Sequence, residues 1–202
     1  MDRRRRWPKG AFPEKYRWRS VQTRLDDARP SEKAAPAFAL LRDNGFSAFE
    51  LHSDPYVQVF SCTVEEIDVR SLQNRLRDEP VFVFEWLAPE PEDDRIKLGV
   101  VASADPIDAV VAVGVAGPQQ GIGTAAVVRF LLALRAYAEY SIVSLGDDFV
   151  RLEISPRDEA AAIAVAERVL ELCKGMARSG ANVDQLKSRM IDDHVLELDW
   201  RG

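Results

Sequence analysis

The apolar positions along the chain alternate between the two-residue period of strands and the longer period of helices. Residues 47–52 and 56–62 alternate apolar and polar side chains on either side of a Ser-Asp-Pro turn, so they predict a hairpin. Residues 81–87 and 96–102 are almost continuous apolar runs, which is typical of strands covered on both faces. Residues 195–200 alternate again and predict a final strand.

Helical spacing occupies the segments between these strands. The pair Asp105-Pro106 is a strong helix start, and we favour a helix over residues 107–115, although their valines would also suit a strand. Thr124 is expected to cap a helix over residues 125–139. The few charged residues of this helix lie within about a third of its circumference, which leaves a wide apolar face. Other helices are predicted at residues 36–44, 63–78 and 155–173 and from Asn182.

Strands that pair in hairpins, with helices between them, indicate an α+β fold. We expect a mostly antiparallel sheet packed against helices as a two-layer sandwich. Three parts are predicted: a basic irregular arm over residues 1–30, a smaller α/β lobe over residues 31–90 and an α+β domain over residues 91–202. The boundary near residue 90 lies in a connector rich in proline and acidic residues.

Charge is distributed unevenly along the chain. The net charge is −6, but residues 1–24 hold nine basic and two acidic residues, a charge of +7 that leaves −13 on the rest. An acidic body repels nucleic acid, whereas a basic arm with aromatic residues can hold phosphates and stack on bases. The candidate nucleic-acid contacts are Arg3, Arg4, Arg5, Arg6 and Trp7. The alternative is an arm that folds onto the acidic body or stays a mobile tail.

Composition excludes several classes of protein. With 202 residues and only two cysteines, the chain is not a disulfide scaffold. No uncharged run is apolar for the roughly 20 residues that a membrane helix needs, and no apolar segment follows the N-terminal arginines as in a secretory signal. We therefore expect a cytoplasmic protein without a membrane partner.

A glycine cluster before the predicted helix at 125–139 is the most suggestive chemical feature. Gly117, Gly121, Gly123 and Thr124 could direct backbone N–H groups at a phosphate. The cluster resembles the pyrophosphate loop of acetyl-CoA-dependent N-acetyltransferases, but Pro118 stands where that pattern has Gln or Arg, and no lysine precedes Thr124 as in a P-loop. The alternative interpretation is a turn followed by a helix start.

Other reactive residues have simpler structural explanations. Asp147 and Asp148 could act together as acid and base, although a turn between strands favours acidic residues anyway. Cys173 falls on an apolar helix stripe, which favours core packing over a reactive thiol. Glu85, within an apolar strand, lies either at an exposed edge or at a functional position. We predict no catalytic residue, no metal site and no cofactor.

From Asp105 onward the chain resembles a bacterial family known only as domain of unknown function 4253. The resemblance covers about residues 105–200 and rests on a series of short motifs. These are Asp105-Pro106, Gly114 and Gly117, Ile122 and Thr124, Asp148-Phe149-Val150, Cys173, Gly180 and Trp200. Polar motifs of the family are replaced here, for example by Cys173-Lys174-Gly175, so a site built on them would be lost. The resemblance implies no activity.

Together these features favour a non-catalytic protein-interaction domain, of the accessory or immunity type, with an unidentified protein partner. An acyl-CoA-dependent N-acyltransferase using Gly121 and Gly123 is the enzyme alternative, and a nucleic-acid-associated module using the basic arm is the third. Residues 107–115 discriminate the first two, because an acetyltransferase needs them as a strand before the loop. The sequence leaves the oligomeric state open.

Overall fold

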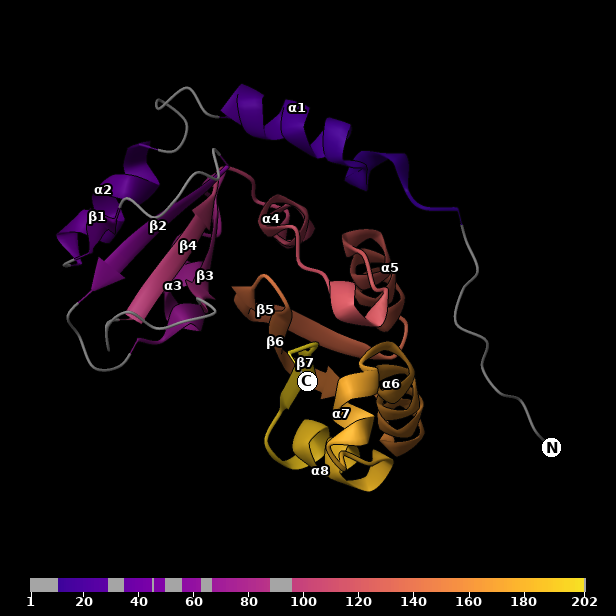
Figure 1. Ribbon diagram of the computed structural model, residues 1–202. Helices are drawn as coiled ribbons and strands as arrows, with labels where there is room; N and C mark the ends of the chain where they lie inside the picture. The colour runs from indigo at the N-terminus through magenta and orange to yellow at the C-terminus, as the bar shows by residue number, and fades with distance from the viewer. Residues whose placement is uncertain are drawn as a thin grey trace. The chain divides into compact units, whose positions relative to one another are not determined.

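The computed structural model describes residues 11–28, 35–44, 46–49, 56–62, 67–87 and 96–201, and Figure 1 shows its elements. The expected α+β class is confirmed, with a mixed and mostly antiparallel sheet whose strands follow the order β1-β2-β4-β3-β5-β6-β7. The strands are β1 Ser47–Phe49, β2 Val57–Cys62, β3 Phe82–Trp86, β4 Ile96–Val101, β5 Ala138–Gly146, β6 Phe149–Pro156 and β7 Val195–Asp199. The helices are η1 Glu14–Tyr16, α1 Trp18–Ala28, α2 Ala35–Asp43, α3 Val69–Arg75, α4 Pro106–Val113, η2 Pro118–Gln120, α5 Thr124–Leu134, α6 Glu159–Leu172, α7 Lys174–Arg178 and α8 Val183–Asp192.

Contacts divide the chain into two compact units. The N-terminal unit comprises Glu14–Val115 and Val143–Asp147. The C-terminal unit comprises Met1–Pro13, Ala116–Ile142 and Asp148–Gly202. This division describes contacts and not separate folding, so the domain boundary near residue 90 stays a prediction.

The N-terminal unit is built on the strands β1-β2-β4-β3, each antiparallel to its neighbour. The predicted hairpin of β1 and β2 is confirmed. Register places Phe60 opposite Leu98 and Val83 opposite Val100, so their side chains share one face of the sheet. These residues form one hydrophobic core with side chains of α2 and α3, such as Leu41.

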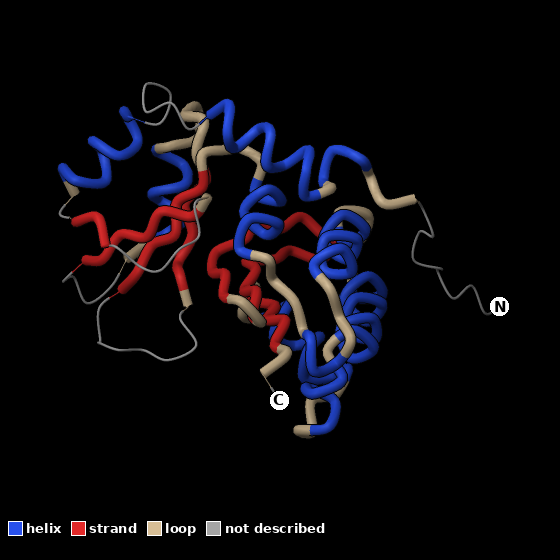
Figure 2. Tube along the Cα trace, turned by 45° about the horizontal axis from the view of Figure 1, so that its top comes forward, coloured by secondary structure: helices blue, strands red, loops and turns tan. Residues whose placement is uncertain are grey.

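The opposite face of these strands is also covered. Five consecutive residues of β4 are buried, which requires protein on both sides because successive side chains point to opposite faces. α4 contacts β2 and β4, and none of its residues belongs to the core formed by α2 and α3. Figure 2 shows helices on either side of these strands. Helices of this unit therefore pack against both faces of these strands.

The expectation of an irregular N-terminal segment was wrong for residues 14–28. η1 and α1 occupy this stretch, and Val21 and Leu25 are fully buried one helical turn apart. That single apolar pair is a weak signal beside the dense charges and tryptophans around it. Residues 1–10, which include Arg3, Arg4, Arg5, Arg6 and Trp7, lie outside the described residues.

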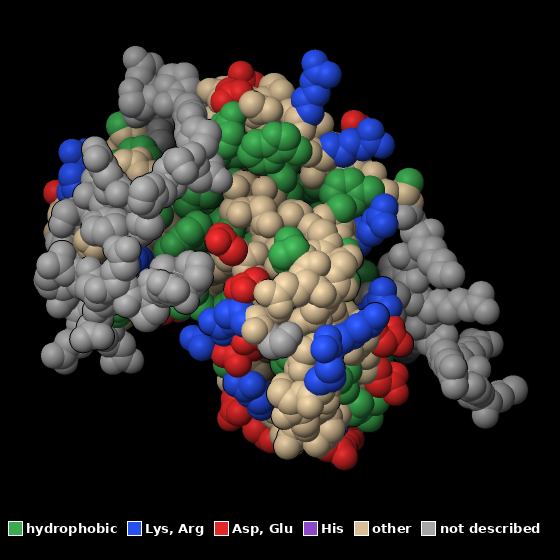
Figure 3. Space-filling model, viewed as in Figure 1, with side chains coloured by type: hydrophobic (Ala, Val, Ile, Leu, Met, Phe, Trp, Pro, Cys, Tyr) green, Lys and Arg blue, Asp and Glu red, His purple; other side chains and the backbone are tan. Residues whose placement is uncertain are grey.

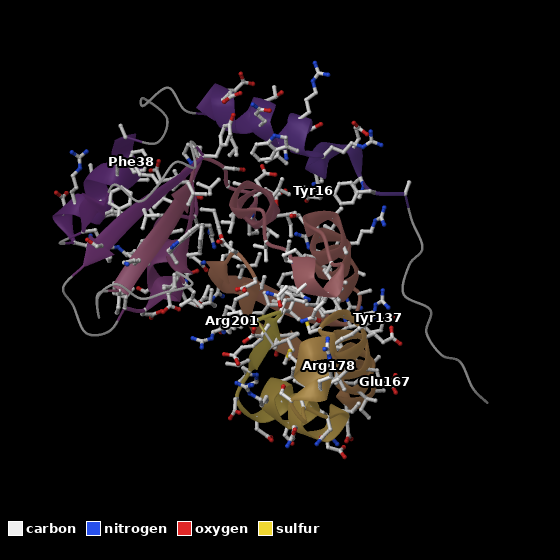
Figure 4. All side chains as sticks on the ribbon, in the orientation of Figure 1. Tyr16, Phe38, Tyr137, Glu167, Arg178 and Arg201 are labelled. Atoms are coloured by element: carbon white, nitrogen blue, oxygen red, sulfur yellow. The ribbon has the colours of Figure 1, made fainter. Side chains whose placement is uncertain are left out.

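Buried polar contacts attach η1 and α1 to α4. The Arg24 guanidinium donates to the fully buried Asp108 carboxylate through Nε (2.9 Å) and Nη2, and the Ser103 hydroxyl donates to the same carboxylate at 2.7 Å. The Tyr16 hydroxyl donates to Asp105, which caps α4, at 2.9 Å, and Figure 4 shows the Tyr16 side chain directed toward α4. The hydrogen bond to Asp108 raises the pKa of Arg24 further above its ordinary value. α1 is therefore held by charge and hydrogen bonding as well as by Val21 and Leu25.

α4 confirms the prediction of a helix over the valine-rich segment. The Asp105 side chain accepts a hydrogen bond from the Ile107 N–H at 3.0 Å, and Pro106 is the first helical residue. Gly114 ends the helix in the left-handed conformation, with φ of 75°. All of these signals come from neighbouring residues, so they can be recognised in the sequence.

The C-terminal unit contains α5–α8 and the strands β6 and β7. Val150 and Leu152 lie opposite Leu198 and Leu196, and this buried face packs against α6 and α8. Figure 1 shows α6, α7 and α8 gathered on one side of these strands. The helix predicted from Asn182 is present as α8, and Asn182 and Gln185 form a complete capping box at its start.

α5 is shorter than the helix predicted over residues 125–139. It has the expected buried face, including Leu131 and Leu134, and Arg129 is exposed. The helix ends at Leu134, the N–H of Tyr137 bonds back to the Leu134 carbonyl, and β5 begins at Ala138. Residues 138 and 139 belong to a strand although alanine and glutamate favour helices, because strand pairing outweighs local propensity here.

We predict that Arg24→Ala destabilises the protein by about 2–4 kcal/mol, because it leaves the buried Asp108 carboxylate without its cation. The cost falls below that of a fully buried pair, since the Arg24 side chain is 39% exposed. Chemical denaturation measures the change, and brief trypsin digestion should cleave after Arg17 and Arg19 in the variant before the wild type. Arg17→Ala, which removes only the exposed pair with Glu14, should cost less than about 0.5 kcal/mol. Equal losses in both variants would show that Arg24 does not hold α1.

Candidate functional site

The glycine loop predicted as a phosphate site is closed on itself. Gly117 and Ile122 exchange two backbone hydrogen bonds, of 2.8 Å from the Gly117 N–H and 3.0 Å from the Ile122 N–H. The N–H groups of Gln120 and Gly121 also bond inside the loop, to Gly117 and Pro118. Four donors that a diphosphate would need are thus already used, which leaves the loop poorly suited to bind one.

The helix start after the loop also differs from the acetyltransferase arrangement. Gly123 is the N-cap of α5 and Thr124 is its first residue, so the expectation that Thr124 caps the helix was wrong. Gly123 has extended backbone dihedrals, which the N-cap position requires, and no side-chain cap bond forms there. The segment before the loop is the helix α4, where an acetyltransferase would need a strand.

The loop instead contacts the C-terminal strand. Gly117 is buried against the Trp200 indole, so closely that a Cβ atom at Gly117 would lie 2.5 Å from the ring. Gln120 bridges two further segments: its amide donates to the Trp200 carbonyl at 3.2 Å and accepts from the Gly175 N–H at 3.1 Å. The Trp200 indole N–H donates to the Leu172 carbonyl at 3.2 Å. The loop therefore serves to position Trp200 and the start of α7.

The remaining candidate residues also make contacts that give them a role in the fold. Cys173 is buried, and burial raises the pKa of its thiol to about 12, so it is not a nucleophile at neutral pH. Asp147 and Asp148 form the turn between β5 and β6, and the Asp148 carbonyl accepts from the Trp200 N–H. Glu85 accepts a 2.5 Å hydrogen bond from the buried Ser144 hydroxyl. Within the described residues, no group of histidine, cysteine and acidic side chains could hold a metal ion.

Gly117, Cys173 and Trp200, which are far apart in sequence, meet in this part of the fold, and all three are motif positions of the family resemblance noted above. A family model, the domain of unknown function DUF4253, matches residues 97–201, more than half of the chain. The chain belongs to the DUF4253 family. No curated protein and no solved structure matches the chain. None of the described helices is long and apolar enough to cross a membrane.

α1 lies outside the DUF4253 match and presents a surface that the sequence analysis missed. Trp18 is 46% exposed, and its ring stands edge-on to Tyr56, with ring centroids 5.3 Å apart and an interplanar angle of 83°. The Gln22 amide donates to the Tyr56 hydroxyl at 2.8 Å. The exposed indole is therefore held in one orientation by its own unit. We call Trp18, Tyr56 and the neighbouring exposed residues of α1 the Trp18 surface.

The charges of α1 run against the helix dipole. The first turn holds Arg19 and no acidic residue, and the last turn holds Asp26 and Asp27 and no basic residue. Arg19, Asp26 and Asp27 are exposed and make no ion pair with any described residue, whereas Arg24 is paired. Figure 3 shows hydrophobic and charged side chains of both signs side by side along the position of α1. Each charge lies at the helix end whose partial charge has the same sign, so this order destabilises the isolated helix.

β7 carries a separate, fully paired set of charges. Glu197 accepts from Arg151 at 2.9 Å and from Arg189 at 2.9 Å, and Asp199 pairs with Arg201 at 2.8 Å. The guanidinium of Arg201, labelled in Figure 4, lies 4.7 Å from the centre of the Phe149 ring. These charges satisfy one another, so they offer no free group to a ligand.

We predict that Gly117→Ala destabilises the protein by about 1–3 kcal/mol, because the added methyl group would overlap the Trp200 ring. Gly123→Ser is the matched control: nothing lies within 4 Å of a Cβ there, and serine supplies the missing cap, so stability should be unchanged or slightly higher. Thermal unfolding of both variants checks this. Loss of stability only in Gly123→Ser would contradict the structural role of Gly117.

We also predict that Glu197 contributes to acid sensitivity. Burial alone would raise the pKa of Glu197, but hydrogen bonds from Arg151 and Arg189 outweigh it and lower the pKa below the ordinary 4.5. A carboxyl with a lowered folded-state pKa stabilises the protein above about pH 4.5, and that stability is lost as the pH falls toward the folded-state value. Between pH 6 and pH 3, wild type should therefore lose more stability than Glu197→Gln in denaturant titrations. Parallel pH profiles would refute the assignment.

Proposed function

We propose that the protein is a non-catalytic protein-binding domain that contacts its partner through the Trp18 surface. One observation carries the proposal: a large aromatic side chain is 46% exposed and yet held in place by Tyr56. Tryptophan is among the residues that contribute most to protein interfaces. Because the ring is already oriented, little conformational entropy is lost on binding.

The charge around Trp18 favours a protein over a nucleic acid. Asp26 and Asp27 lie eight and nine residues after Trp18, about 12–14 Å along the helix axis. Arg19 beside Trp18 would attract a phosphate, but the two aspartates would repel a nucleic-acid backbone that continued along α1. An apolar centre with a rim of both charges is instead the usual composition of a protein–protein interface.

A non-catalytic role is supported by the use of the candidate reactive groups in folding. The N–H groups of the glycine loop bond to the loop itself, and the Cys173 thiol has a pKa of about 12. Glu85 accepts from Ser144 within the sheet of its own unit. The glycine loop was the basis of the enzyme alternative in the sequence, and each of these groups has a structural explanation here.

Photo-crosslinking tests the proposal in cells. The full chain would carry p-benzoylphenylalanine in place of Trp18 and, in a matched control, in place of the exposed Asp184 on α8. We predict a discrete protein adduct from position 18 that survives nuclease treatment and is absent from position 184. An adduct removed by nuclease would favour nucleic acid, and no adduct specific to position 18 would refute the proposal.

A further inference from the structure

We propose that the partner of the Trp18 surface is a second copy of this chain, bound with the two α1 helices antiparallel about a two-fold axis. This inference rests on the proposed function and names the occupant of the same surface. Its basis is the arrangement of Arg19 and Asp26, two exposed residues of opposite charge that make no ion pair with any described residue of the chain.

The spacing of these two residues makes α1 self-complementary. Arg19 and Asp26 are seven residues apart, two helical turns or about 10.5 Å, and therefore lie on the same side of α1. In an antiparallel pair centred between Gln22 and Thr23, Arg19 of each copy stands opposite Asp26 of the other. One two-fold axis then forms both ion pairs at once, as an isologous interface requires. Trp18 precedes Arg19 and lies about 100° away around the helix, so an indole stands beside the line of ion pairs at each end of the contact.

The same arrangement accounts for the unfavourable charge order of α1. In one copy, a cation lies near the positive end of the helix dipole and two anions near its negative end. An antiparallel neighbour places its Asp26 and Asp27 beside that positive end and its Arg19 beside the negative end. The charges that weaken the isolated helix therefore stabilise the pair. A different protein with charges of both signs would have no reason to match the charges at both ends of α1. A second copy of the chain matches both ends by symmetry.

The expected dimer is weak. α1 has eleven residues and is about 16 Å long, so a contact along one helix buries less than the roughly 1,200 Å² of stable interfaces. Exposed ion pairs also contribute little individually and are screened by salt. We therefore expect monomer at low protein concentration and a growing dimer fraction at high concentration and low salt.

Charge reversal provides a direct test by analytical ultracentrifugation of the full chain. Arg19→Asp and Asp26→Arg each replace two attractive pairs with two repulsive ones, so each should weaken self-association by about tenfold or more. Mixing the two variants should restore it. In the mixed pair the two substituted side chains, which carry opposite charges, face each other at one end of the contact, and the native Arg19 and Asp26 face each other at the other end. Arg178→Asp, at the exposed end of α7, is the control for net charge and should associate like wild type.

The outcomes distinguish the second-copy inference from the proposed protein-binding function. A wild-type chain that stays monomeric at all concentrations, or single variants that associate like wild type, would overturn the second-copy inference. The mixing experiment also separates charge pairing from misfolding, since two misfolded variants would not restore one another. If position 18 crosslinks to a different protein while the chain is monomeric, the proposed function stands and this inference fails. An adduct of twice the chain's mass, together with restoration on mixing, supports both.

Discussion

The buried carboxylate of Asp108 is the constraint on which the N-terminal unit depends. A carboxylate with no solvent exposure is tolerated only where a cation and hydrogen-bond donors surround it, and Arg24 and Ser103 provide them. Because Arg24 belongs to α1, satisfying Asp108 places α1 against α4. Tyr16, in η1 just before α1, adds its bond to Asp105 and sets the same placement. The position of Trp18, and of the surface around it, follows from this buried charge.

In the part of the chain that matches DUF4253, Trp200 has a comparable organising role. Its indole rests on Gly117 and bonds to the Leu172 carbonyl, and its own backbone bonds to Gln120 and Asp148. A glycine is needed at position 117 because the ring approaches too closely for a side chain. The feature that looked most like a phosphate site is thus explained by packing. Glycine before a helix supports ligand binding only when its N–H groups are free.

Elements defined by short-range signals could be predicted from the sequence. The hairpin of β1 and β2, the helix α4 with Asp105 and Gly114, and the capping box of α8 all depend on residues a few positions apart. α1 depends on partners far away, since Arg24 and Asp108 are 84 residues apart, and the sequence offers no local sign of their pairing. The early start of β5 was missed because the apolar spacing of α5 continues past Leu134, where the helix ends. Once α1 is known to be a helix, its reversed terminal charges are the signal that points to the Trp18 surface.

That reversal is informative because α1 departs from local rules that the well-capped helices α4, α6 and α8 follow. α4, α6 and α8 begin with a side-chain cap and an acidic residue in the first turn, as the dipole favours. α1 has neither, and its stability comes from Val21, Leu25 and the buried ion pair. A helix held by tertiary contacts does not need its exposed residues for its own stability. Those positions are then open to selection for binding, and departures from local preference tend to mark such sites. The exposed indole and the reversed charges of α1 are therefore two separate observations that favour the same helix as the proposed binding element.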